Sequence, residues 1–263
     1  MSKIVYLLGG AGNVFFQMLQ VAKKDESVLL CDFFIRPSVR KFFGHTDHKE
    51  VYKEIFVEKK TNFFHFSILF LLFDMVLARF FGFTLFSVID VKRLKGRPIF
   101  REYIYFGYFQ SGVEISEIYN FKSVVVKNIR LKEKKEKCVM HVRGGDFIKS
   151  NSHLESEYYE ACIKHVCENV SPLDIVVVTN DVAFSKNLIS KISYKFNFTI
   201  QKNTEAEDFE VINSSEILIC SNSTFALAAG LTGNYIKRLY LPVEMKEKFL
   251  FNNDVKGVEI CFE

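Results

Sequence analysis

A chain of 263 residues, of which 49% are hydrophobic, is long enough for two domains with substantial cores. Its net charge of +4 is too small for a typical nucleic-acid-binding protein, and the sequence has no RNA-binding motif or zinc-finger spacing. The six cysteines are scattered and three stand in apolar runs, which indicates reduced, buried thiols rather than a disulfide framework. The first residues lack the layout of a signal peptide, so we expect a cytoplasmic location.

The beginning of the chain predicts a strand, a glycine-rich turn and a helix. The strand covers residues 3–8, the turn 9–13 (Gly-Gly-Ala-Gly-Asn) and the helix 14–24, and a second strand follows at 28–32. A glycine-rich loop before a helix favours anions or polar ligand atoms. Its spacing matches neither a dinucleotide fingerprint nor a P-loop.

The apolar segment 63–89 approaches the length of a membrane span. His65, Asp74 and Arg79 fall at different angles around a helix, and each would cost about 3 kcal/mol at the centre of a bilayer. We therefore expect either a pair of buried core helices or an interfacial helix that dips into a membrane surface. The basic run 127–137 either adds attraction to anionic lipid or is a solvated connection between domains.

Two other stretches of the first half have a structural interpretation. Residues 45–48 (His-Thr-Asp-His) lack a supporting third ligand cluster, so we expect a solvated loop rather than a metal site. The aromatic stretch 103–110 predicts a core strand.

From residue 138 onward, apolar runs and helical patterns alternate regularly. The predicted strands are 138–142, 174–179, 196–201, 216–220 and 237–241, and the predicted helices are 155–168, 182–192, 205–213 and 224–230. Such alternation indicates a parallel sheet with helices on both faces. The first part repeats the pattern less cleanly. We therefore predict an α/β fold of two Rossmann-like halves facing a cleft, with domains at 1–130 and 131–263.

Polar turns follow three of these strands. They contain His141 and Arg143, Asn180 and Asp181, and residues 221–224 (Ser-Asn-Ser-Thr). The carboxyl ends of strands in a doubly wound sheet share one edge, where ligands bind. A guanidinium and helix N-terminal amides suit phosphate, and a carboxylate suits the N–H groups of a base. Together these turns predict a pocket for a nucleotide diphosphate.

Five motifs, in order, resemble the bacterial α-1,2-fucosyltransferases of glycosyltransferase family 11. They are residues 9–17 (GGAGNVFFQ), 107–111 (GYFQS), 141–147 (HVRGGDF), 179–181 (TND) and 220–226 (CSNSTFA). The resemblance implies a fold of the GT-B type, with the nucleotide sugar held by the second domain and the acceptor largely by the first. It also implies an inverting mechanism without a metal ion or cofactor, and the chain has no Asp-x-Asp with suitable context.

The resemblance also implies roles for single residues on the donor side. Arg143 matches the arginine that contacts the donor pyrophosphate, and His141 and Asp181 match positions that read guanine. Ser223 and Thr224 match hydroxyl residues near the β-phosphate, and Ser221 belongs to the same donor-binding turn.

The other implied residues lie around the reacting sugar. Asn13 matches a loop residue near the reacting centre, with Gly12 and Gln17 beside it on the acceptor side. Asp146 either orients Arg143 or acts as the base, and the first role is favoured. The candidate catalytic residues are Arg143, Asn13 and Asp146.

The chain departs from the family pattern at Gly144, where the family has a second arginine. The expected activity is transfer of L-fucose from GDP-fucose to a sugar hydroxyl of a lipid-linked bacterial surface polysaccharide or O-antigen unit. The expected acceptor position is O2 of a galactose. Two alternatives stay open: another donor such as GDP-colitose, which Gly144 motivates, and a nucleotide-sugar-binding protein without catalysis. The apolar segment 63–89 would suit an enzyme on the inner face of the cytoplasmic membrane, and no nucleic-acid partner is expected.

Overall fold

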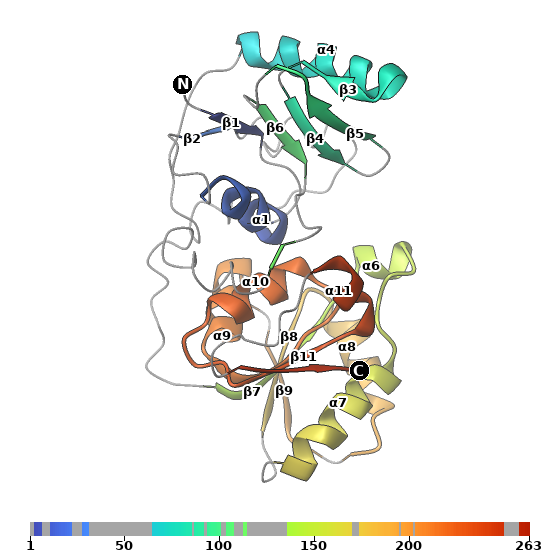
Figure 1. Cartoon of the computed structure of the whole chain (residues 1–263). Helices are drawn as coiled ribbons and strands as arrows, with labels where there is room; N and C mark the ends of the chain where they lie inside the picture. Colours follow the sequence, from blue (N-terminus) through green and yellow to red (C-terminus); the bar gives the residue numbers. More distant parts are fainter. Residues whose placement is uncertain are drawn as a thin grey trace. The chain divides into compact units, whose positions relative to one another are not determined.

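The computed structural model describes thirteen stretches of the chain. They are residues 3–6, 11–22, 28–31, 65–85, 87–91, 94–100, 104–107, 113–114, 136–169, 174–194, 196–201, 203–249 and 258–263. Gly9 and Gly10, the residues 45–48, and the basic run up to residue 135 lie outside them. The chain divides into an N-terminal unit (1–110 with 123–127) and a C-terminal unit (111–122 with 128–263). Each contains a sheet and helices, which confirms the predicted α/β class (Figure 1).

The sheet of the N-terminal unit has the strand order β2-β1-β6-β4-β5-β3. Its strands are β1 (Lys3–Tyr6), β2 (Val28–Cys31), β3 (Phe83–Thr84), β4 (Ser87–Val91), β5 (Leu94–Pro98) and β6 (Ile104–Gly107). The strands β2, β1, β6 and β4 run parallel, whereas β5 pairs antiparallel with β4. The predicted strands at 3–8, 28–32 and 103–110 correspond to β1, β2 and β6.

Helix α1 (Ala11–Ala22) begins three residues earlier than predicted. The expected turn at 9–13 is therefore wrong for Gly12 and Asn13, which lie in the first helical turn. Amides of that turn have no partner within the helix, so a glycine there costs less than in the helix interior. The following residues Val14 to Gln17 are all buried, and this packing stabilises the helix.

Helix α4 (His65–Phe81) is one helix, so the expected pair of buried core helices is wrong. It packs on the sheet through Leu71, Asp74 and Ala78, which are buried and spaced as on one helical face. The Asp74 Oδ1 accepts a hydrogen bond from the Leu85 amide at 2.8 Å, which ties the helix to the strand connection that follows it. No helix in the described part of the chain is long and apolar enough to cross a membrane. Figure 1 shows α1 and α4 on opposite sides of the strands.

The six strands of the C-terminal unit are all parallel, in the order β12-β11-β10-β7-β8-β9. The strands are β7 (Glu136–Val142), β8 (Ile175–Thr179), β9 (Phe198–Gln201), β10 (Ser215–Ile219), β11 (Arg238–Leu241) and β12 (Glu259–Phe262). The helices are α6 (Asp146–Lys149), α7 (Ser156–Asn169), α8 (Val182–Ser190), α9 (Glu205–Asn213), α10 (Thr224–Thr232) and α11 (Val243–Lys248). The predicted alternation of strands and helices is confirmed, and α6, α11 and β12 are additional.

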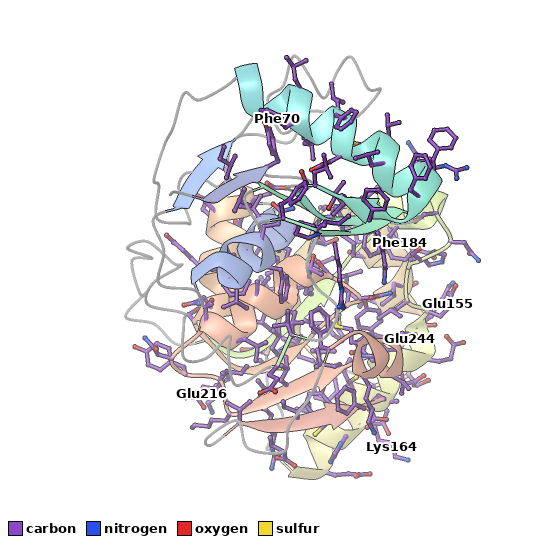
Figure 2. The ribbon with its side chains drawn as sticks, turned by 45° about the horizontal axis from the view of Figure 1, so that its top comes forward. Phe70, Glu155, Lys164, Phe184, Glu216 and Glu244 are labelled. Carbon is purple, nitrogen blue, oxygen red and sulfur yellow. The ribbon has the colours of Figure 1, made fainter. Side chains whose placement is uncertain are left out.

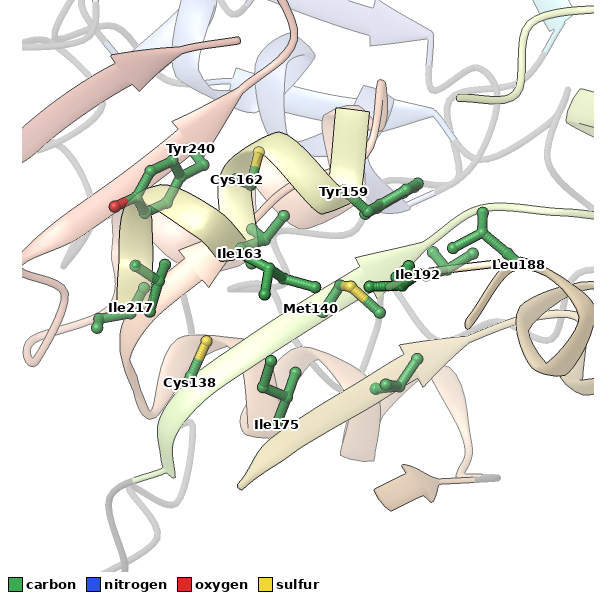
Figure 3. Packing of buried hydrophobic residues seen from close by; sticks show 14 residues of the cluster. Cys138, Met140, Tyr159, Cys162, Ile163, Ile175, Leu188, Ile192, Ile217 and Tyr240 are labelled. Carbon is green, nitrogen blue, oxygen red and sulfur yellow. The ribbon is translucent and has the colours of Figure 1, made fainter. Parts of the chain in front are cut away.

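The helices of the C-terminal unit cover both faces of its sheet. Side chains of β7 alternate, so Met140 points into a core formed with α7 and α8, as Figure 3 shows with Ile163 and Leu188. On the other face, a Cβ at Gly230 of α10 would lie 2.5 Å from the Leu218 side chain, so this helix rests directly on β10. The sheet is therefore doubly wound.

The five cysteines of the C-terminal unit, Cys138, Cys162, Cys167, Cys220 and Cys261, are free thiols, and three of them are buried. Burial raises the pKa of the Cys138 thiol to about 12, so this group stays protonated.

From β7 the chain adds β8 and β9 on one side of this strand, and it then returns to add β10 on the other side. The direction in which strands are added therefore reverses between β7 and β10. Ligands of doubly wound sheets bind outside the carboxyl ends of the strands at such a reversal. A ligand site is therefore expected at the residues that follow β7 and β10.

Candidate functional site

His141 lies at the carboxyl end of β7 and joins this strand to the turn after β10. Its neighbours Met140 and Val142 face α7 and α8, so alternation turns His141 towards α10. The His141 Nδ1 and the Ser221 Oγ share a hydrogen bond of 2.7 Å, and both residues are buried. Burial, with a smaller contribution from Arg143, lowers the pKa of His141 to about 3, so the imidazole is neutral near pH 7.

Arg143 presents a guanidinium at the same edge of the sheet. Its Nη2 lies 3.1 and 3.2 Å from the two carboxylate oxygens of Asp146, and its Cζ lies 5.3 Å from the centre of the Phe147 ring. The Nε of Arg143 is buried and has no hydrogen-bond partner among the described residues. A buried donor without a partner costs about 1–3 kcal/mol, so this atom suits a ligand acceptor.

The turn after Arg143 is bonded to the turn after β8. The Gly144 amide donates to the Asn180 Oδ1 at 2.9 Å, and the Gly145 amide donates to the Asp181 Oδ2 at 3.3 Å. The other oxygen of Asp181 accepts from the Phe184 amide at 3.0 Å, so Asp181 caps α8. Each oxygen of this carboxylate thus accepts one protein N–H.

The third polar turn leads into α10. Ser221 and Ser223 are buried, and the Ser223 amide donates to the Ser221 carbonyl at 2.6 Å. Ser223 is the N-cap residue of α10, but its hydroxyl makes no capping bond in the described structure. The first amides of α10 lie at this end, where the helix dipole favours an anion.

Two tyrosines that the sequence-based reasoning treated only as helix residues hold this edge from α7. The Tyr158 hydroxyl donates to the Cys220 carbonyl at 2.7 Å and is 3.3 Å from the Tyr240 carbonyl. The Tyr159 hydroxyl donates to the His141 carbonyl at 3.4 Å. The adjacent Tyr-Tyr pair is the sequence signal for this role.

The three candidates of the N-terminal unit lie on α1. Gly12 and Gln17 are buried and Asn13 is partly exposed. Asn13 and Gln17 are four residues apart, so they lie on the same side of the helix. The structure thus brings His141, Ser221 and the Arg143 turn together in one unit, and the acceptor-side candidates together in the other.

Among the described residues, no group of three or more His, Cys, Asp or Glu side chains is arranged to hold a metal ion.

Comparison with known proteins gives the family. The sequence profile of glycosyl transferase family 11 matches residues 93–256, more than half of the chain. A search of curated proteins finds no match. Among solved structures, the glycosyl transferase family 9 protein from Veillonella parvula DSM 2008 aligns over 100% of this chain and 85% of its own, with 10% identity and a TM-score of 0.46. On the evidence of the profile match, the chain belongs to glycosyl transferase family 11 and is a glycosyltransferase.

Proposed function

We propose that this glycosyltransferase moves L-fucose from GDP-fucose to O2 of a galactose in a bacterial surface polysaccharide or O-antigen repeat unit. The family supports a nucleotide-sugar donor and a glycan acceptor. The five motifs supply the finer assignment of fucose and guanine. We propose that no metal ion or cofactor takes part.

The observation that supports the donor site best is the Nε of Arg143, which has no hydrogen-bond partner among the residues that the structure describes. This donor is buried at the point where chain order reverses, two residues beyond the His141 contact with Ser221. Asp146 takes up only Nη2, which leaves the guanidinium able to bind a pyrophosphate oxygen. Ser223 and Thr224, with the first amides of α10, complete the phosphate side.

In the proposed step, the acceptor oxygen attacks C1 of the sugar while the bond from C1 to the β-phosphate oxygen breaks. The electron pair of that bond leaves with GDP, the configuration at C1 inverts, and the acceptor proton is lost to a base or to water. Negative charge grows on the β-phosphate, and Arg143 stabilises it there. One well-placed donor of this kind is worth about 3–4 kcal/mol.

The proposed base-binding side consists of His141 and Asp181. The imidazole is neutral, so it does not compete with Arg143 for the phosphates. Each Asp181 oxygen accepts one protein N–H and keeps a second lone pair, which suits the N1 and N2 hydrogens of guanine. We assign Gly12, Asn13 and Gln17 to the acceptor side, with Asn13 beside the reacting sugar, because they match the first motif.

The donor assignment is tested by a thermal-shift titration with GDP, UDP and dTDP and their sugars. The proposal expects stabilisation by GDP and GDP-fucose only, followed by GDP release when a galactose acceptor is added. Stabilisation by UDP or dTDP instead would refute the guanine site. GDP-colitose is the second candidate donor, since Gly144 removes the second arginine of the family pattern; faster turnover with it than with GDP-fucose would replace fucose in the proposal.

We further propose that α4 contacts the membrane that carries a lipid-linked acceptor. Seven of its large apolar side chains are between 47% and 75% exposed: Leu69, Phe70, Leu72, Phe73, Val76, Phe80 and Phe81. Figure 2 draws these side chains, with Phe70 labelled. Arg79 on the helix and Lys95 and Arg97 on the adjacent β5 are exposed as well. Aromatic and basic side chains together favour an interface with anionic lipid.

Sedimentation with vesicles tests this contact. The full chain should bind vesicles that contain anionic lipid more strongly than neutral vesicles, and Phe80→Asp should weaken binding. The matched control is Val243→Asp, which places the same charge at an exposed apolar position of α11. Equal sedimentation of all three proteins would refute the contact.

A further inference from the structure

We infer that Asn180 is a positioning residue, which together with Asp181 locks the turn that carries Arg143, and that Gly144 is what lets this lock close. The lock consists of two observed hydrogen bonds, from the Gly144 amide to Asn180 and from the Gly145 amide to Asp181. Its effect on donor binding rests on the proposed role of Arg143.

The lock consists of two successive amides on one turn and two successive side chains on the next. Strands β7 and β8 are in register up to Val142 and Thr179, so the turns that follow them begin side by side. The Gly144 amide then reaches Asn180, and the Gly145 amide reaches Asp181. Arg143 therefore follows a strand that is paired with β8 and precedes two residues whose amides are hydrogen-bonded to the neighbouring turn.

The partners in the second turn are themselves held in place. The Asp181 amide donates to the Thr179 Oγ1 at 3.0 Å, and the Thr179 hydroxyl is in turn 2.7 Å from the Ser185 Oγ. The same carboxylate caps α8 through the Phe184 amide. Asp181 therefore cannot retreat without uncapping the helix.

Gly144 is required for this closeness. A Cβ added at this position would lie 2.7 Å from the Asp181 Cβ and 3.1 Å from the Phe184 Cδ1. The next residue, Gly145, has a φ of +58°, in the region that favours glycine. Any side chain at 144 must therefore push the turn away from Asp181 and stretch the bond from the Gly144 amide to Asn180.

This packing gives a physical reason for the departure from the family pattern. An arginine at 144 would not simply add a second cation to the site, because its Cβ already has no room. In this chain a turn closed by backbone bonds presents a single guanidinium. Because the turn is already rigid, a ligand that binds the guanidinium has a smaller entropy cost of ordering to overcome.

Amide hydrogen exchange of the free protein tests the lock. Asn180→Ala should speed exchange of the Gly144 amide roughly two- to tenfold, as expected for loss of one hydrogen bond. Asn180→Asp keeps an acceptor oxygen and should keep most of the protection. Asn187→Ala, at an exposed position of the adjacent α8, is the matched control and should leave this amide unchanged. Equal exchange in wild type and Asn180→Ala would overturn the inference.

Calorimetric titration with GDP then tests the consequence. Asn180→Ala should bind GDP severalfold more weakly, and Gly144→Arg should also bind it more weakly although it restores the arginine of the family pattern. If exchange speeds up but GDP affinity does not change, the lock stands and the proposed donor role of the Arg143 turn fails. If Gly144→Arg binds GDP more tightly with the Gly145 amide still protected, the inference that the lock needs glycine at position 144 is refuted.

Discussion

Replacing Arg143 by lysine separates the catalytic use of this side chain from its structural use. Lysine keeps the positive charge but has a single ammonium in place of the planar fork of five N–H donors. In the structure the fork points in two directions, because Nη2 faces Asp146 while Nε has no partner in the part of the chain that the structure describes and is assigned to the proposed ligand. One ammonium cannot serve both.

The two expected magnitudes differ widely. The ion pair is largely solvated, since the Asp146 side chain is 59% exposed, so its contribution to folding is at most about 1 kcal/mol. A domain of ordinary stability, about 5–15 kcal/mol, tolerates that loss without unfolding. Loss of one donor to the leaving phosphate costs about 3–4 kcal/mol, which is a rate reduction of roughly 10²- to 10³-fold.

The assay measures GDP release with a saturating acceptor, together with the melting temperature of each variant. Arg143→Lys should lose activity by the factor above while its melting temperature falls by only a few degrees. Asp146→Asn, which keeps the size of the carboxylate but removes its charge, measures what this carboxylate contributes, either by orienting Arg143 or as the base. Transfer by Arg143→Lys within threefold of wild type would show that the guanidinium is not the group that stabilises the leaving phosphate.

Three further predictions concern stability. Gly144→Ala should lower the free energy of unfolding by about 1–3 kcal/mol in urea denaturation, because the new methyl group meets Asp181; an unchanged midpoint would contradict the short contact. The pKa of His141 is lowered from 6.5 to about 3, so between these values the unfolded chain binds a proton that the folded chain does not. The free energy of unfolding should therefore decrease as the pH is lowered below 6.5, by up to about 1.4 kcal/mol per pH unit. His141→Asn should flatten this part of the urea-derived stability profile, and parallel profiles would refute the assignment. Asp74→Ala should cost about 1–3 kcal/mol by leaving the Leu85 amide without its acceptor, whereas Asp74→Asn should cost less; equal losses would rule out this bond as the cause.

Local sequence patterns were enough to predict most strands and helices of the C-terminal unit, although not α6, α11 and β12. The strand β8 is a short β-branched run between turn residues, and the cap of α8 at Asp181 follows from residue type alone. The polar turns were predicted to share an edge because parallel strands place their carboxyl ends together. The contact of His141 with Ser221, 80 residues apart in sequence, is the direct outcome of that topology.

The N-terminal unit was harder because tertiary contacts override local preference there. Strand β5 contains Gly96 and Pro98, which disfavour a strand. The structure shows why the glycine is needed, since a Cβ at Gly96 would lie 2.5 Å from the Thr84 side chain and 3.0 Å from that of Ala78. The apolar character of α4 was visible in the sequence, but only the structure shows that one narrow face packs on the sheet.

The same distinction explains what was missed in the site. Residue types favoured Arg143 as a ligand for an anion, because a guanidinium that follows a strand at that edge suits phosphate. They did not indicate that Gly144 and Gly145 would bond to Asn180 and Asp181, because those bonds involve backbone amides, which every sequence has. A turn held in this way confers rigidity without a second charged side chain. Under the proposed function, the packing of the glycine beside Arg143, rather than the number of arginines in the motif, would set how firmly the diphosphate is held.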